Sequence, residues 1–315
     1  MRRFITAVAA FGLILAACAK DNPAVTSGGS TGTSGASGAS GSSGASGAAS
    51  CSTDTLSLVN AGQLTIGTDN PAYPPYFAGG ETKDNPDWKF NDPYTGKGFE
   101  DAVAYEVASR LGFDTGQVQW VVAPFNQTYK PGPTNYDFAI EQISYSAKRA
   151  QAVDFSESYY DVNQAVVGVK GSPITQATSI ADLKAFSLAA PIGTTSYDFI
   201  VNTIQPNSEA GAYNSLSDSV AALNAGQVDG IVVDLPTALY LADPFVQEVK
   251  NGVVVGQFAT AATGEYFGLT FAKGSSLVAC VNQALDAMKS DGTLAQITTT
   301  WLSQKTNVGE VPVLT

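Results

Sequence analysis

Two side chains of opposite charge, Arg149 and Asp234, lie where a small charged molecule could be bound. The chain has four arginines, and Arg149 alone lies in a polar turn directly after a strand-like run, residues 136–140. A guanidinium fits a carboxylate with two parallel hydrogen bonds. Asp234 directly follows the strand-like run 229–233, and its carboxylate can accept hydrogen bonds from an ammonium. The pair therefore predicts a site that binds an anion at one end and a cation at the other.

Two further stretches would complete such a site. Residues 193–196, Gly-Thr-Thr-Ser, lie between a strand-like run and a predicted helix, so their backbone N–H groups would face outward at the positive end of the helix dipole. Asp69 ends another strand-like run, and Tyr73 and Tyr76 follow it with rings that can form walls. Opposed charges with aromatic walls suit a zwitterionic amino acid, and the rings also suit a cationic or apolar side chain.

Each of these residues has a structural alternative. An arginine after a strand often makes a structural or surface ion pair, and Asp234 can instead cap the helix that follows it. Residues 193–196 can form an N-cap without a ligand, and Tyr73 and Tyr76 can simply pack. No Gly-Lys-Ser/Thr sequence accompanies Gly193, so a phosphate-binding loop is excluded.

The elements that position these residues alternate between strand and helix. The spacing of Phe99, Val103 and Val107 predicts an amphipathic helix that stops at Gly112. The alternation suggests a parallel sheet covered by helices, and its restart after residue 169 suggests a second α/β lobe inserted into the first. In such sheets ligands bind outside the carboxyl ends of strands, where the candidate residues fall. The predicted strands are 64–69, 118–122, 136–140, 164–169, 186–190, 229–233, 253–255 and 266–271, and the predicted helices begin near residues 99, 180, 197, 217 (capped by Ser217 or Asp218) and 275.

Composition excludes several classes of protein. The net charge is −12 at pH 7 and there is no basic run, which argues against binding to nucleic acid or to anionic lipid by charge. The sequence has no histidine, so a histidine-based triad, a histidine-ligated zinc and a histidine general base are excluded. We expect neither a metal nor a cofactor.

The N-terminal part of the chain has the pattern of an export and anchoring signal. Arg2 and Arg3 precede a short apolar run, which is typical of a secretory signal and predicts one over residues 1–17. The ending Leu-Ala-Ala-Cys resembles a bacterial lipobox, which implies cleavage before Cys18 and lipidation of its thiol; the alternative is an ordinary signal peptide. Residues 18–56 would then be a lipid anchor and a flexible tether rich in Ser, Gly and Ala.

Two cysteines remain once Cys18 is set aside. Outside the cytoplasm an even pair favours a disulfide, here between Cys51 and Cys280, which would tie the end of the tether to a C-terminal helix. A bridge that closes so long a loop can add roughly 2–4 kcal/mol to stability. The alternative is two separate free thiols.

Short motifs follow one another along the chain: Gly67-Thr68-Asp69, Tyr73-Pro74-Pro75-Tyr76, Gly98-Phe99-Glu100, Ser144 to Arg149, Val153-Asp154-Phe155-Ser156, Gly193-Thr194-Thr195-Ser196, Asp229 to Asp234, and Lys289 to Leu294. In this order and spacing they resemble the family 3 extracellular solute-binding proteins, the polar amino-acid receptors of ABC importers. The resemblance covers roughly residues 57–303. It implies an α/β, two-lobe periplasmic-binding-protein type II fold with two crossover hinge strands, near 165–169 and 254–260. The implied first lobe is 57–166 with 257–315, and the second is 167–256.

The resemblance implies a clamp for the part that all amino acids share. Arg149 would hold the α-carboxylate, and Ser144 would add a hydroxyl and an N–H. Thr194 and Thr195 would donate to the same carboxylate from the second lobe, and Asp234 would accept the ammonium.

Four more positions are implied as ligand contacts. Gln142 stands where family members often have a glycine whose carbonyl accepts the ammonium, so only its backbone could keep that role. Asp69, Tyr73 and Phe125 would contact the ligand's side chain. The stretch from Asp69 to Gly98 is longer than is usual and rich in aromatic residues, which affects this side-chain pocket more than the clamp.

The function implied is an extracytoplasmic, lipid-anchored, amino-acid-binding receptor that delivers its ligand to an ABC transporter permease with its ATPase. We expect a monomer that is not an enzyme and does not bind nucleic acid. One alternative is a dehydratase-type enzyme on the same fold that acts on a cyclic carboxylic acid, and another is a sensor without transport. Acidic, amide, basic and aromatic ligand side chains all fit the motifs.

Overall fold

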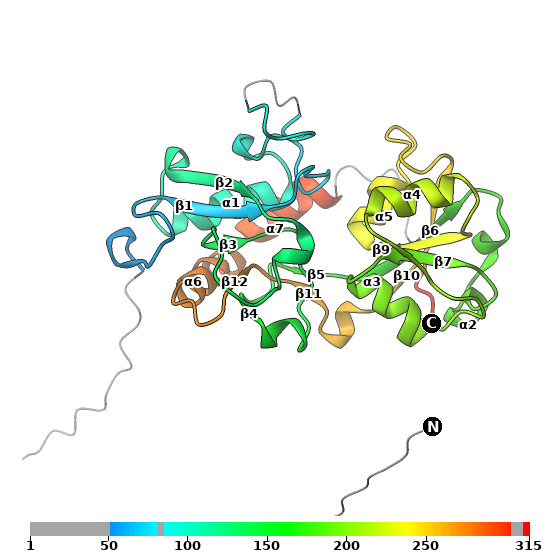
Figure 1. The fold of residues 1–315 in the computed structure, drawn as a ribbon. Helices are drawn as coiled ribbons and strands as arrows, with labels where there is room; N and C mark the ends of the chain where they lie inside the picture. Colours follow the sequence, from blue (N-terminus) through cyan, green and yellow to red (C-terminus); the bar gives the residue numbers. More distant parts are fainter. Residues whose placement is uncertain (1–50, 81–84, 304–310) are drawn as a thin grey trace, which may run out of the picture. The chain divides into compact units, whose positions relative to one another are not determined.

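The computed structural model describes residues 51–80, 85–303 and 311–315, which contain two five-stranded sheets (Figure 1). The predicted signal segment 1–17 and Cys18 lie outside the described residues, as does the tether before Cys51. Across the first sheet the strands are β2 (Val118–Val122), β1 (Leu64–Thr68), β3 (Phe138–Ala139), β12 (Thr270–Ala272) and β4 (Val153–Phe155). Across the second they are β10 (Gly252–Phe258), β6 (Gln164–Val169), β9 (Gly230–Asp234), β7 (Leu188–Pro191) and β8 (Gly211–Tyr213), and β5 (Tyr160–Asp161) pairs separately with β11 (Tyr266–Phe267).

The first sheet is mixed, whereas the alternation of strands and helices predicted a parallel one. β1 pairs in parallel with β2 and β3, but β12 runs antiparallel to β3 and β4. β12 returns to this sheet after the chain has built the second sheet, and local periodicity carries no information about the direction of such a return. The strand predicted at 136–140 is shorter in the structure, although Ile140 N still donates to Gly67 O at 3.0 Å.

Three helices pack with the first sheet around one hydrophobic core: α1 (Phe99–Arg110), α6 (Leu277–Ser290) and α7 (Thr293–Thr298). The predicted stripe on α1 is buried, and complete burial of such a side chain contributes roughly 1.5–3 kcal/mol. α6 buries one face in the same way. The fully buried residues of the two helices include Phe99, Val103, Val107, Val281, Leu285 and Met288.

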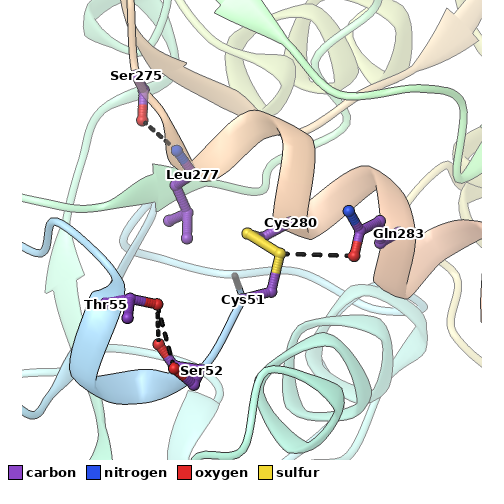
Figure 2. Close-up of a disulfide and its surroundings, with 7 residues drawn as sticks. All are labelled: Cys51, Ser52, Thr55, Ser275, Leu277, Cys280 and Gln283. Atoms are coloured by element: carbon purple, nitrogen blue, oxygen red, sulfur yellow. Dashed lines mark hydrogen bonds between the residues drawn. A yellow bond between two sulfur atoms is a disulfide. The ribbon is translucent and has the colours of Figure 1, made fainter. Parts of the chain in front are cut away.

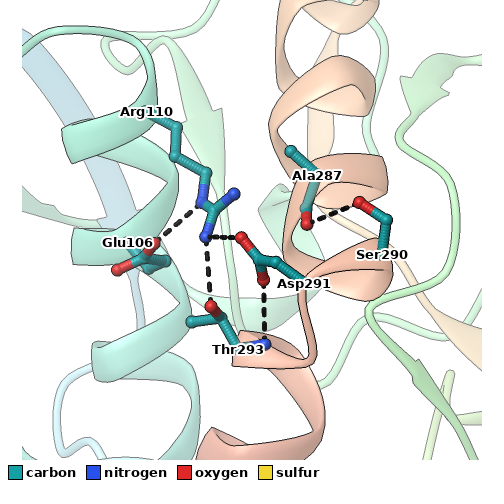
Figure 3. Close-up of polar contacts among 6 residues, drawn as sticks. All are labelled: Glu106, Arg110, Ala287, Ser290, Asp291 and Thr293. Atoms are coloured by element: carbon teal, nitrogen blue, oxygen red, sulfur yellow. Dashed lines mark hydrogen bonds and ion pairs between the residues drawn. The ribbon is translucent and has the colours of Figure 1, made fainter.

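The start of α7 is held to the end of α1 by polar contacts (Figure 3). Arg110 Nε donates to Glu106 Oε1 at 2.7 Å, one turn earlier on α1. Its Nη2 donates to Asp291 Oδ2 at 2.8 Å and to Thr293 Oγ1 at 3.1 Å, across the turn between α6 and α7. The arginine thus makes a structural ion-pair cluster among the helices that pack with the first sheet.

A disulfide closes the same region. Cys51 and Cys280 are bonded with an Sγ–Sγ distance of 2.06 Å, and Figure 2 shows that the bridge joins the first described segment to α6. The two residues are separated by 229 positions. Leu56 and Leu58 pack on the first core nearby, so this segment is held by apolar contacts as well as by the covalent bond.

The second sheet is covered on both faces. Successive residues of β6 point to opposite sides, so Ala165 and Val167 lie in one core and Val166 in another. Helices α4 (Leu216–Asn224) and α5 (Leu235–Leu241) contribute to the first of these cores, and α2 (Ile180–Leu183) to the second. α3 (Thr195–Phe199) continues into a wider turn, Ile200–Ile204, which also packs in the second core.

The predicted crossover strands correspond to β6 and β10, which pair with each other in antiparallel. The predicted lobe boundaries, 166/167 and 256/257, fall inside these two strands, yet both strands pair along their whole length within the second sheet. The last described residues join this sheet too, since Val313 pairs with Gln257 and Leu314 is buried in its core. The division of the chain into lobes stays a prediction.

The N-cap of α4 differs from the predicted Ser217 or Asp218. It is Ser215, whose hydroxyl accepts from Asp218 N at 3.1 Å. Several Ser and Asp residues in this run could cap the helix. The cap is the one whose side chain accepts a hydrogen bond from the backbone N–H three residues later. Over the described part of the chain, none of the helices is long and apolar enough to cross a bilayer.

Candidate functional site

The nine residues predicted as ligand contacts all line one cavity of about 730 Å³. Strand ends and turns from both sheets supply them, as expected for ligand sites outside the carboxyl ends of strands. They are Asp69, Tyr73, Phe125, Gln142, Ser144, Arg149, Thr194, Thr195 and Asp234.

Arg149 begins a short 3-10 turn, Arg149–Gln151, and is buried with 8% of its surface exposed. Its Nη1 donates to Ser144 O at 2.7 Å and its Nη2 to Gly193 O at 2.9 Å. The guanidinium carbon lies 4.3 Å from the centroid of the Tyr129 ring, a cation–π contact. Burial lowers the pKa of Arg149 from its usual value, and within the described residues no carboxylate forms an ion pair with it. The described arginine that forms structural ion pairs is Arg110, with Glu106 and Asp291.

Asp234 ends β9 and occupies the N-cap position of α5, but its side chain makes no capping hydrogen bond. Its carboxylate instead accepts from Gln164 Nε2 at 2.6 Å, and the same amide nitrogen donates to Glu265 Oε1 at 3.0 Å. Burial, followed by the charge of Glu265, raises the pKa of Asp234 to about 8. The carboxyl is therefore largely protonated near neutral pH, and a cation placed against it would displace the proton.

Thr194 and Thr195 have different surroundings. The Thr194 hydroxyl caps α3, accepting from Tyr197 N at 3.1 Å and donating to Pro191 O at 2.7 Å. The N-cap alternative therefore describes Thr194 in this structure. The Thr195 hydroxyl donates to Ser144 Oγ at 3.3 Å, so two of the predicted donors face each other from the two sheets.

Gln142 adopts a left-handed backbone conformation with φ of 47°. Its backbone N donates to Glu100 Oε1 at 2.6 Å, and its side-chain amide donates to Glu100 Oε2. The Tyr159 hydroxyl also donates to Glu100, which is fully buried. Burial raises the pKa of Glu100 to about 7, and these hydrogen bonds oppose the rise. Both the backbone and the side chain of Gln142 are thus bound by Glu100. These hydrogen bonds stabilise a left-handed backbone conformation that glycine adopts more readily than other residues.

The residues expected to contact a ligand side chain lie toward the ends of β1 and β2. Asp69 directly follows β1, and its Oδ1 accepts from Asn70 N at 2.8 Å. Phe125 meets Tyr129 edge to face at 5.4 Å between ring centroids. The Tyr73 hydroxyl lies 3.3 Å from Ser217 Oγ, on α4, which packs with the second sheet.

Glu141 is a residue of this cavity that the sequence analysis missed. It lies just beyond β3 and is 7% exposed, and its Oε2 has no hydrogen-bond partner among the described residues. Burial and then the charge of Asp69 raise the pKa of Glu141 well above its usual value. The signal that could have found it is its position, since it directly follows the strand-like run 136–140. Within the described chain no cluster of three or more acidic, histidine or cysteine side chains could hold a metal ion.

Comparison with known proteins agrees with the fold. Residues 64–304 match the family described as bacterial extracellular solute-binding proteins, family 3. The chain is 28% identical over 256 residues to the L-cystine-binding protein TcyA of Bacillus subtilis (strain 168), covering 79% of this chain and 84% of that protein. It is 26% identical over 211 residues to the ABC transporter glutamine-binding protein GlnH of the same strain, covering 66% and 73%.

A solved structure of an ancestral arginine-binding protein bound to arginine matches with a TM-score of 0.61 and 26% identity, covering 77% of this chain and 99% of that chain. The predicted type II periplasmic-binding-protein fold is confirmed.

Proposed function

This chain belongs to the bacterial extracellular solute-binding proteins of family 3, and we propose that it receives a polar amino acid for an ABC importer. The ligand's α-carboxylate binds Arg149 and Ser144 on the first lobe and Thr195 on the second, and its ammonium binds Asp234. Thr194 contributes by capping the helix that presents Thr195.

The observation that carries this proposal is the charge left unpaired in the cavity. Arg149 is buried and carries a positive charge, and its guanidinium is held by two backbone carbonyls and the Tyr129 side chain. The charge of Asp234 acts on it without forming an ion pair in the described structure. Asp234, in the same cavity, accepts from a neutral amide. A buried charge without an ion-pair partner is costly, and the carboxylate of a zwitterion would supply that partner to Arg149. Its ammonium would bind Asp234, which ionises as the ammonium reaches it.

Lobe closure is the mechanism that this arrangement favours. Arg149 and Ser144 belong to the first lobe, and Gly193, Thr195 and Asp234 to the second, so a bound amino acid bridges the lobes. A ligand shifts the lobes toward the closed state only as far as it binds that state more tightly. Contacts to both lobes at once provide such a difference.

The test is amino-acid binding to the purified protein and to an Arg149→Ala variant. A thermal-shift screen of the standard amino acids identifies ligands, since binding to the folded state raises the melting temperature. Calorimetry then gives affinity, and we expect Arg149→Ala to lose about 2–5 kcal/mol, or about 30-fold to 5,000-fold, because a buried carboxylate is left unpaired. Arg110→Ala is the matched control, since it removes the other described arginine at a distance from the cavity. Unchanged affinity in Arg149→Ala would refute the clamp.

We further propose that the receptor is a monomer held to the membrane through a lipidated Cys18 and works with a permease and its ATPase. A Cys18→Ser variant should lose the lipid mass and partition into the aqueous phase of a detergent extraction. Recovery of the unmodified variant in the detergent phase would contradict the anchor.

We propose that the protein is not an enzyme. The reported relatives are solute-binding proteins, and the carboxyl groups of the cavity are assigned to ligand binding. Incubation with a cyclic carboxylic acid such as prephenate should leave the compound unchanged. Turnover that depends on Asp234 would instead favour the dehydratase alternative.

A further inference from the structure

We propose that the cavity selects an amino acid with a cationic side chain, which Asp69 and Glu141 bind together. This inference rests on the proposed function, because Arg149 and Asp234 are taken to hold the ligand's common part. It adds the chemical class of the side chain.

Backbone register brings the two carboxyl groups together. β1 and β3 pair in parallel with Ile66 opposite Phe138 and Gly67 opposite Ala139. Continued by two residues, this register sets Asp69 opposite Glu141 at adjacent strand ends, where neighbouring strands are about 4.8 Å apart. The effect of the Asp69 charge on Glu141 agrees with this proximity.

One carboxyl oxygen of Glu141 lacks a hydrogen-bond partner among the described residues, and the side chain that its carboxyl does contact, Asp69, is another acid. More than nine-tenths of the Glu141 surface is buried, and its Oε2 makes no hydrogen bond in the described structure. The neighbouring Thr68 Oγ1, which also lines the cavity, is unpartnered as well. Natural interiors rarely leave such groups unsatisfied, so a ligand with hydrogen-bond donors is the missing partner.

Charge decides which donor fits. The charges that act most on Glu141, those of Asp69 and Glu100, are both negative, and the one basic residue lining the cavity is Arg149. An acidic ligand side chain would add a third carboxylate to this end, and an amide would leave the pair charged or protonated. An ammonium or guanidinium satisfies both carboxyl groups with charge-assisted hydrogen bonds. The rings of Tyr73 and Phe125 suit the stem or face of such a side chain.

The comparison of L-arginine with L-citrulline isolates the charge, because the two have nearly the same shape. We expect the purified protein to bind arginine about tenfold or more tightly than citrulline in calorimetry. Glu141→Gln should reduce this preference to about twofold or less, while citrulline binding changes little. Glu209→Gln is the matched control, since it makes the same substitution at an exposed position and should keep the preference. If Glu141→Gln does not fold, Asp69→Asn, at a less buried position, should reduce the preference for arginine over citrulline in the same way.

The outcomes separate this inference from the proposed function. If citrulline or glutamine binds as tightly as arginine and binding still requires Arg149, the cationic class is refuted and the amino-acid receptor stands. A preference for arginine that Glu141→Gln and Asp69→Asn both leave intact also refutes the assignment to this pair. If no amino acid binds at all, the proposed function is refuted and the inference with it.

Discussion

Reduction of the Cys51–Cys280 disulfide should destabilise the protein without unfolding it. The perturbation changes one covalent bond and no side-chain type. Leu56 and Leu58 still pack on the first core after reduction, and Cys280 remains inside it on α6. We therefore expect the reduced protein to fold, with a lower free energy of unfolding.

The size of the loss follows from the loop that the bridge closes. The two cysteines are 229 positions apart, and the chain-entropy relation gives about 5 kcal/mol for a loop of that length. This value is an upper limit, because residual structure in the unfolded chain reduces the entropy that the bridge removes. We expect a loss of about 2–5 kcal/mol.

Urea unfolding followed by tryptophan fluorescence, with and without reductant, measures this loss. The control is the double variant Cys51→Ser/Cys280→Ala, in which alanine avoids burying a hydroxyl at the nearly inaccessible position 280. Reductant should leave the control unchanged, and its stability should match that of the reduced wild type. A difference below about 1 kcal/mol between the oxidised and reduced wild type would refute the loop-closure reasoning.

Two further predictions concern the start of α1. Gly98→Ala should destabilise the protein by about 3 kcal/mol or more in urea unfolding, because a Cβ there would lie 2.2 Å from Tyr76 O at a φ of +124°. Gly132→Ala, at a φ of +126° with open space around it, should cost clearly less, and equal losses would contradict the steric explanation. Glu100 has a pKa of about 7 in the folded protein against 4.5 ordinarily, so between these values the folded state keeps a proton that the unfolded state has released. The unfolding free energy of the wild type should therefore fall relative to that of Glu100→Gln by up to about 3 kcal/mol between about pH 5 and pH 8, and a constant difference would count against the raised pKa.

The parts of the site that could be predicted are those governed by position along the chain. Arg149 and Asp234 were predicted because both are charged residues that follow strands, and ligands bind outside the carboxyl ends of strands. The stripe on α1 was predicted because helical periodicity places Val103 and Val107 on one face. These inferences need only local sequence.

What could not be predicted depends on partners far away in the sequence. The antiparallel direction of β12 arises from pairing with β3 and β4, which periodicity does not encode. Glu141 follows a predicted strand, but only the β1–β3 register shows that it lies beside Asp69. Likewise, the left-handed conformation of Gln142 depends on hydrogen bonds to Glu100, whose own burial the sequence does not state.

The buried carboxyl groups have a consequence for how ligand binding can be observed. Glu100 and Asp234 have pKa values of about 7 and about 8, in a chain with no histidine to exchange protons in this range. A proton released when an ammonium reaches Asp234 would therefore come from a carboxyl group. Protonated and ionised carboxyl groups absorb at different infrared frequencies, so difference spectra would report occupancy of the cavity without an attached label.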